Sequence, residues 1–376
     1  MKELIRANFG LLAAGVATFV MMGAGQSLYG PALPAFARNL DLSMAAAAWL
    51  VSAHWIGCAI GVGFMYFAGT RVVPRHVIAT MALGAALVTF GPGRFGAFGG
   101  ALVFGAGYGA ATVVFNPRIL RAFGDKGTAM LSLLNASFGI GAIAIPLIFV
   151  WMGSNPAQTF GLVTVMAIAI WLGAGPAGRT GSASAETVVA EFHPHLALQL
   201  FAVVGIGLEA CLIGLGPTAL IDLGLSEESA AQHLSAFFTA FLGARVGLVL
   251  VAHLVAPFTL YIGAMLFSVA CLSLGLIVSP GPFFVIIGLA AGLYFPSFYV
   301  SASKVMGDHP KTPATIIAAG LVGGILAPIL LGGLLDEIGG RGLFLVLIIA
   351  AAGAAGAGLV VRLRLPELRG SGRLGL

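Results

Sequence analysis

Two side chains that can take up and release a proton lie inside long uncharged stretches of this 376-residue chain. Glu209 stands in GIGLEACLIG and His54 in VSAHWIG, with apolar residues on both sides. An acid at the centre of a membrane helix costs about 2.5–3.5 kcal/mol on insertion scales, and histidine titrates near physiological pH. We predict that Glu209 and His54 are candidates for proton coupling and that Glu209 is also a candidate for substrate binding. The alternative for each is a fixed structural hydrogen bond.

Arg245 is a third charged residue in an apolar stretch, FLGARVGLVL. It lies near the predicted end of its helix, so reaching the membrane interface competes with binding a substrate anion or acting as a gate. Polar and aromatic side chains at mid-helix depth can bind the hydroxyl or amide groups of a solute, or bond to neighbouring helices. The candidates of this kind are Gln26, Tyr29, Tyr108, Asn116, Asn135 and Tyr294.

Enzymatic chemistry has no support in the sequence, which contains no HExxH, no Walker sequence and no nucleophile with a base at a suitable spacing. The three cysteines, Cys58, Cys211 and Cys271, lie in apolar runs without CxxC spacing or clustered histidines. We therefore predict no metal, no cofactor and no disulfide framework, and we expect no ATP drive from this chain.

The elements that position these residues follow from the composition. Hydrophobic residues make up 59% of the chain and charged residues 8%, whereas soluble proteins have about 25% charged residues. This composition predicts an all-α polytopic membrane protein, and at ~30 residues for each span and loop the chain accommodates about twelve spans. The net charge of +5 then reflects loop topology rather than nucleic-acid binding. We predict that the function lies within the helical bundle.

The individual spans are given by intervals without charged residues, except that Glu209 lies inside the seventh span and Arg245 inside the eighth. The first run is too long for a cleaved signal peptide, so we expect it to be retained. The predicted spans are 7–37, 42–70, 76–93, 95–117, two within 127–178 divided at 153–158, 194–222, 229–252, two within 246–303 divided at 279–282, 312–335 and 342–361.

The basic residues predict the orientation of these spans. With both termini in the cytoplasm, only Arg38, Arg94 and Arg341 of the 18 Lys and Arg residues face the other side, and Arg245 lies within the membrane. Basic residues concentrate on the cytoplasmic side of membrane proteins. We therefore predict a multi-pass protein of the inner membrane with both termini in the cytoplasm.

The chain divides into two halves of six predicted helices. A stretch rich in Gly, Ser, Ala and Thr predicts a cytoplasmic linker at 177–193, between bundles at 1–176 and 194–376. GAIAIP at 141–146 and GGILAP at 323–328 occupy the fifth helix of each half. Two pseudo-symmetric halves are typical of secondary transporters, which bind substrate near the bilayer midplane where the repeats meet.

Several motifs rich in Gly and Pro follow one another along the chain. They are GAGQSLYGPALPAF (23–36), GAGYGAATVVFNP (105–117), LNASFGIGAIAIP (134–146), GIGLEACLIGLGPTAL (205–220), LSAFFTAFLGARVG (234–247), GLAAGLYFPS (288–297) and AAGLVGGILAPILLGGLLDEIGGR (318–341). In this order they resemble the major facilitator superfamily and its fucose-permease-like branch. The resemblance implies a fold of two six-helix bundles that moves solute by a rocker-switch.

The chain departs from this family at three positions. In the loop AGTRVVPRH, Thr70 replaces the usual acid, while Arg71 and Arg75 remain as candidates for a cytoplasmic gate. The resemblance places Gly30 and Thr112 where sugar/proton symporters of the branch carry acids. Proton symport by that route is not supported, so any proton dependence is expected to run through Glu209 or His54.

The leading functional hypothesis is secondary active or facilitated transport of a small organic solute by a monomer in the lipid bilayer, with a coupling proton or other ion as an option. Two alternatives stay open from the sequence. One is efflux of amphipathic compounds, which the sparse polar lining favours. The other is a non-transporting assembly factor with the same fold.

Overall fold

The computed structural model describes residues 2–68, 72–175, 177, 193–251, 254–307 and 311–368, and every regular element in these ranges is helical. The predicted all-α fold is confirmed. Ten of the helices are long and apolar enough to cross a membrane. The twelve predicted spans all coincide with helices; α4, with 17 residues, and α10, with Glu227, Glu228 and Arg245, are not among those ten.

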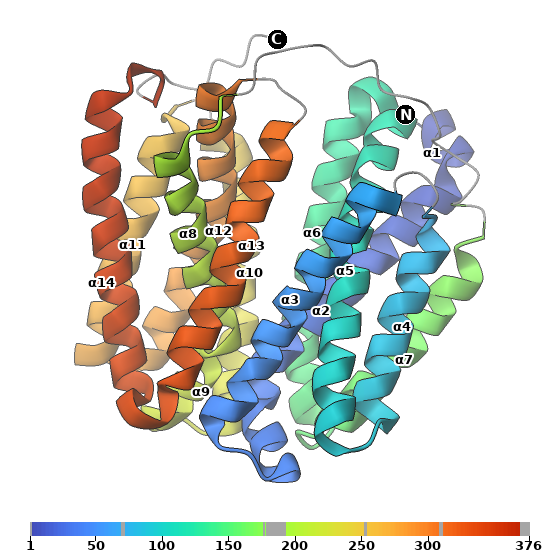
Figure 1. Ribbon diagram of the computed structural model, residues 1–376, viewed down its shortest axis with the longest axis horizontal. Helices are drawn as coiled ribbons and strands as arrows, with labels where there is room; N and C mark the ends of the chain where they lie inside the picture. Colours follow the sequence, from blue (N-terminus) through green and yellow to red (C-terminus); the bar gives the residue numbers. More distant parts are fainter. Residues whose placement is uncertain are drawn as a thin grey trace. The chain divides into compact units, whose positions relative to one another are not determined.

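The chain forms two compact units, Met1–Ala185 and Glu186–Leu376. Almost all of the predicted linker at 177–193 lies outside the described residues, so its bounds stay a prediction. The helices of the first unit, coloured blue to green in Figure 1, are α1 (Lys2–Ala7), α2 (Phe9–Leu40), α3 (Met44–Ala68), α4 (Pro74–Phe90), α5 (Gly93–Phe123), η2 (Gly124–Lys126), α6 (Gly127–Trp151) and α7 (Pro156–Gly173).

The second unit, coloured yellow-green to red, repeats the plan of the first (Figure 1). Its helices are α8 (Leu196–Gly214), α9 (Gly216–Asp222), α10 (Glu227–Val251), α11 (Pro257–Ile277), α12 (Pro280–Met306), α13 (Lys311–Gly333), α14 (Leu335–Arg364) and η4 (Pro366–Leu368).

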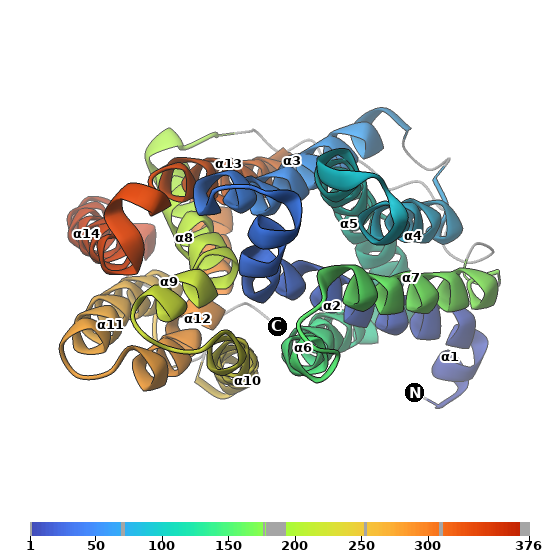
Figure 2. The same ribbon diagram turned by 90° about the horizontal axis from the view of Figure 1, so that it is seen from below.

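Corresponding helices pack in the same pairs within each unit. In the first unit α2 packs against α6, α3 against α5, and α4 against both α5 and α7. In the second unit the equivalent pairs are α8 with α13, α10 with α12, and α11 with both α12 and α14. Figure 2 shows these helices nearly end-on. The repeat predicted from GAIAIP and GGILAP falls on the equivalent helices α6 and α13, which confirms two pseudo-symmetric bundles.

Glycines bring α3 and α5 into backbone contact. A Cβ atom on Gly57 or Gly61 of α3 would lie 2.0 Å from a carbonyl oxygen of α5, and one on Gly105 of α5 would lie 2.0 Å from the carbonyl oxygen of His54. Small residues allow this approach in membranes, where van der Waals packing replaces the hydrophobic effect between helices. The approach places His54 directly against α5.

Two helix breaks differ from the sequence prediction. The predicted span 194–222 divides at Leu215 into α8 and α9, because Pro217, the second residue of α9, cannot donate a hydrogen bond to the preceding turn. The last span was predicted from 342, whereas α14 begins at Leu335 and kinks at Gly339 (φ 61°). There, the Gly340 amide donates a 2.6 Å hydrogen bond to the Asp222 carboxylate. Because this part of α14 contains charged residues, the charge-free interval left it out of the predicted span.

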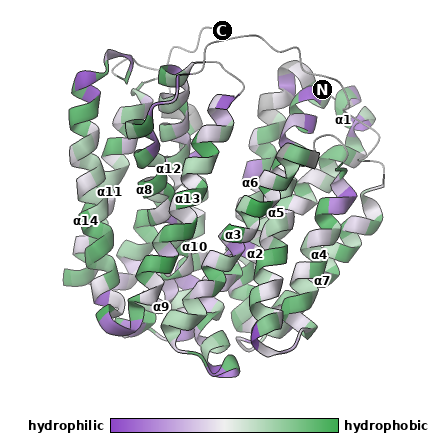
Figure 3. Cartoon of the chain, viewed as in Figure 1, coloured by the Kyte–Doolittle hydropathy of each residue, from purple (hydrophilic) through white to green (hydrophobic). Residues whose placement is uncertain are grey.

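Apolar residues make up most of the length of the helices in both units, and hydrophilic residues lie mainly near the helix ends (Figure 3). Large apolar side chains such as Phe67, Phe90, Phe95 and Trp151 are more than three-quarters exposed. Such exposure is expected where lipid is the solvent.

Candidate functional site

In the first unit, His54 on α3 forms the centre of a buried aromatic cluster. Its ring centroid lies 5.1 Å from that of Tyr108 on α5 and 5.4 Å from that of Tyr29 on α2. Phe104, one turn before Tyr108, lies 5.9 Å away, and Phe160 of α7 stacks obliquely 5.3 Å from Tyr29. The structure thus brings together Tyr29, His54 and Tyr108, which the sequence places on three different predicted spans.

Several polar atoms of this cluster are buried without a hydrogen-bond partner in the described chain. They are both ring nitrogens of His54, the Tyr29 hydroxyl and the Gln26 amide oxygen. Gln26 lies three residues before Tyr29 on α2, so the two side chains share a helix face. A buried polar group without a partner costs about 1–3 kcal/mol. The cluster is therefore a place where the polar groups of a ligand would gain hydrogen bonds.

The two predicted asparagines have different surroundings. The side-chain oxygen of Asn116 on α5 is buried, and the described residues offer it no partner. Asn135 on α6 is exposed, and its amide donates a 2.9 Å hydrogen bond to the Leu131 carbonyl one turn earlier. The structure does not join Asn135 to the aromatic cluster by any contact that it describes.

In the second unit, Glu209 of α8, Arg245 of α10 and Tyr294 of α12 form the second polar group. One carboxyl oxygen of Glu209 is buried with no hydrogen-bond partner among the described residues. Arg245 and Glu209 interact electrostatically, and so do Glu209 and Tyr294. The Arg245 guanidinium lies 4.3 Å over the Phe241 ring, and its Nε donates to the Gly292 carbonyl at 3.4 Å.

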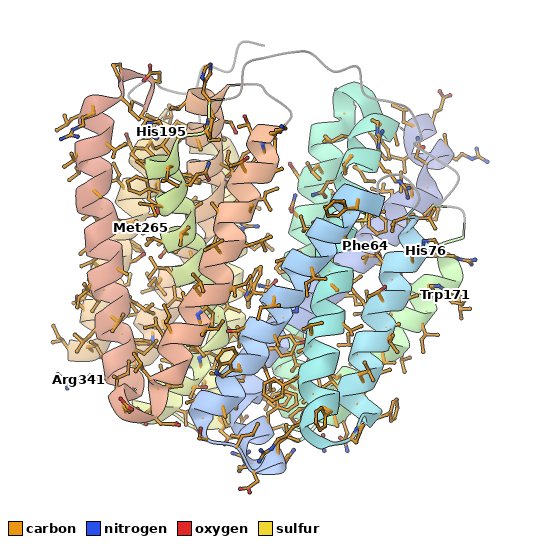
Figure 4. The ribbon with its side chains drawn as sticks, in the orientation of Figure 1. Phe64, His76, Trp171, His195, Met265 and Arg341 are labelled. Carbon is orange, nitrogen blue, oxygen red and sulfur yellow. The ribbon has the colours of Figure 1, made fainter. Side chains whose placement is uncertain are left out.

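The predicted gate residues are only partly described. Arg71 lies outside the described residues. Arg75, at the start of α4, donates a 3.2 Å hydrogen bond to the Leu172 carbonyl in the last turn of α7 and lies 5.2 Å from the Trp171 ring. Figure 4 labels Trp171 and the neighbouring His76 at this end of the first unit. A cation at a helix C-terminus is stabilising, so Arg75 ties α4 to α7.

Sequence reasoning missed several residues that complete the two groups. Phe104 and Phe160 line the aromatic cluster, but nothing distinguishes them among 26 phenylalanines. Ser268 of α11 bonds to the Tyr294 hydroxyl, and serine in an apolar helix carries little signal. The signal that could have found Ser268 is its position seven residues after Tyr261, which places both on one face of α11.

Comparison with known proteins places the fold. A bacterial homolog of the human lysosomal transporter Spinster has a TM-score of 0.71 at 13% identity over 98% of each chain. A D-xylose-proton symporter has a TM-score of 0.71 at 12% identity over 97% of this chain and 98% of that one. These identities show a shared fold alone.

Sequence relatives cover less. The glucose/galactose transporters of two Brucella abortus strains, 9-941 and 2308, are 29% identical over 142 residues. That match covers 36% of this chain and about a third, 34%, of the relatives. The fucose-permease-like branch stays a prediction. A family model described as Major Facilitator Superfamily matches residues 15–316. The chain therefore belongs to the major facilitator superfamily, as the order of its motifs predicts.

Proposed function

We propose that this protein is a transporter that moves a small polar organic solute across the membrane by alternating access. The observation that carries the proposal is the set of buried polar atoms without hydrogen-bond partners in the described first unit, on Gln26, Tyr29 and His54. Hydrocarbon supplies no hydrogen bonds, so such atoms persist in a membrane protein at a free-energy cost. A solute that bonds to them offsets this cost.

The chemistry of the cluster favours a hydroxylated ring as the solute. Tyr29, Tyr108 and Phe104 supply aromatic faces, while His54 and Gln26 supply donors and acceptors. Binding sites for small molecules combine apolar walls with a few placed polar groups. The partial relatives are named glucose/galactose transporters, which supports testing hexoses first.

Glu209 and His54 stay the proposed carriers of any proton dependence. Thr112, at one position where the symporter branch carries an acid, donates its hydroxyl to the Gly109 carbonyl at 2.7 Å. If neither Glu209 nor His54 couples to protons, the protein is a facilitator or uses another ion.

Transport in liposomes tests the proposal. We expect purified protein to exchange radiolabelled D-glucose, D-galactose or D-xylose in counterflow, and Glu209→Gln and Asn135→Ala each to reduce the exchange rate at least several-fold without loss of folded protein. The control is Gln158→Ala. Gln158 is exposed in the first turn of α7, and its backbone N–H, which the substitution keeps, donates to the Asn155 side chain. Thermal stability should also rise with bound sugar by mass action.

Several outcomes would contradict this proposal. Wild-type exchange in both Glu209→Gln and Asn135→Ala would exclude these residues from the binding site. Transport of amphipathic cations but no sugar would favour efflux. Absence of exchange and of thermal stabilisation with every solute would favour a non-transporting assembly factor.

A further inference from the structure

Three buried oxygen atoms in the second unit form a hydrogen-bond chain with a defined direction. The Ser268 hydroxyl lies 2.7 Å from the Ala264 carbonyl oxygen, one turn earlier on α11, and also bonds to the Tyr294 hydroxyl of α12. A carbonyl oxygen only accepts, so the single hydroxyl proton of Ser268 is donated to Ala264. Tyr294 must then donate its own proton to Ser268. Figure 4 labels Met265, the residue after Ala264, on α11.

This direction leaves the Tyr294 oxygen as an acceptor toward any other neighbour, because its only proton is already used. Tyr261, which lies on the same face of α11, donates its hydroxyl to the Phe201 carbonyl at 2.8 Å. Its proton is also used. Neither tyrosine can therefore donate a hydrogen bond to a carboxylate on α8 while these bonds are made.

Glu209 lies beside this chain. A Cβ atom on Gly205 would lie 3.5 Å from both the Tyr294 Cβ and the Tyr261 hydroxyl oxygen, and Glu209 is one turn further along the same face of α8. Helices α8 and α12 run antiparallel as the first and fourth spans of the unit, and side chains lean toward the N-terminus of their own helix. The Tyr294 side chain thus leans from Gly205 toward Glu209, whose charge acts on it.

We propose that Ser268 is a positioning residue that leaves the Tyr294 hydroxyl oxygen available as an acceptor, so that protonated Glu209, whose buried Oε2 has no partner among the described residues, turns to donate its proton to Tyr294. This inference rests on the proposed role of Glu209 in proton coupling. The described residues supply the buried Oε2 of Glu209 with no hydrogen-bond donor, and the charge of Arg245 stabilises the ionised carboxylate. Glu209 therefore has a separate partner for each protonation state.

The other titratable groups around Glu209 in the described second unit do not replace these partners. Helix α13 has only Lys311, at its first residue, and the charges of α14 lie in its first two and last turns. Asp222 of α9 is engaged by the Gly340 amide. On α12, Tyr299 and Lys304 stand more than one turn after Tyr294, and the thiols Cys211 on α8 and Cys271 on α11 are weak hydrogen-bond donors.

Infrared spectroscopy of the purified protein tests this arrangement without a substrate. The carbonyl stretching band of a protonated carboxylic acid is followed against pH in wild type, and its loss in Glu209→Gln assigns it to Glu209. In Ser268→Ala, Tyr294 is released to donate to the carboxylate, so we expect the band to disappear at a pH lower by about one unit, the equivalent of one hydrogen bond. Tyr294→Phe removes the acceptor and is expected to act in the same direction.

The matched control is Ser301→Ala. Ser301 of α12 is buried and donates to the Ser297 carbonyl at 2.7 Å, like Ser268 on its own helix, and its replacement should leave the band unchanged. The proposal is overturned if the band in both Ser268→Ala and Tyr294→Phe follows the control, or if wild type shows no band that depends on Glu209. Uptake of D-glucose is measured separately, so a failure of transport is distinguishable from a failure of this assignment.

Discussion

Two buried tyrosines, one in each unit, differ in whether their hydroxyl groups have a hydrogen-bond partner. Tyr29 is 1% exposed and the described chain offers its hydroxyl no partner, whereas Tyr261 is fully buried and donates to the Phe201 carbonyl at 2.8 Å. Removing a hydrogen bond that is made costs about 1 kcal/mol, whereas removing an unpartnered group releases its desolvation cost. Thermal unfolding in detergent should therefore show Tyr261→Phe destabilised by about 1 kcal/mol and Tyr29→Phe equal to or more stable than wild type.

The variants Tyr29→Phe and Tyr261→Phe also distinguish an effect on stability from an effect on solute binding. If Tyr29 binds solute, Tyr29→Phe loses most of the thermal stabilisation that D-glucose or a related sugar gives to wild type, while Tyr261→Phe keeps it. Equal destabilisation of the two variants would show that the Tyr29 hydroxyl has a partner in the folded protein, and the binding role would lose its support.

At the scale of single residues, the sequence indicated the chemically active groups but not their contacts. Glu209, His54 and Arg245 were found because charge and polarity are costly in hydrocarbon, and this cost can be read from one residue and its neighbours. Ser268 and Phe160 were missed because their importance comes from contacts with other helices. Those contacts depend on packing between helices far apart in the chain.

At the scale of elements, the contact between α3 and α5 makes a sharp prediction. A Cβ atom on Gly105 would lie 2.0 Å from the His54 carbonyl oxygen, a backbone atom that cannot turn away. Gly99, on the same helix, has nothing within 4 Å of such an atom. We expect Gly105→Ala to separate α3 from α5 and to lower the yield of monodisperse protein several-fold, whereas Gly99→Ala behaves as wild type in size-exclusion chromatography.

Normal yield and stability of Gly105→Ala would mean that α3 and α5 are not in backbone contact.

The spans themselves were predictable because a helix in hydrocarbon must be apolar along its length, so charged residues mark its ends. The break at Leu215 could not be predicted in this way, because the proline that causes it is uncharged. The kink at Gly339 could not be predicted either, because it lies among charged residues, which the charge-free interval leaves out.

At the scale of the whole molecule, the division into two similar halves followed from the sequence. Six predicted helices on each side of a polar stretch, together with one weak repeat, indicated two halves of the same design. The structure agrees, because equivalent helices pack in the same pairs within each unit. The orientation in the membrane depends on loop charges, which act during insertion.

Orientation is therefore predicted from charge alone. Only Arg38, Arg94 and Arg341 lie at the ends predicted to face away from the cytoplasm, and Figure 4 shows Arg341 and His195 at opposite ends of the second unit, as alternating spans require. A green fluorescent protein fused after Leu376 should fluoresce, and alkaline phosphatase at the same position should be inactive, because the first folds in the cytoplasm and the second requires the periplasm. Fusions after Gly153, between α6 and α7, should give the reverse result. Active phosphatase after Leu376 together with fluorescence after Gly153 would invert the topology, and the basic ends of α5 and α14 would then face the periplasm against the charge rule.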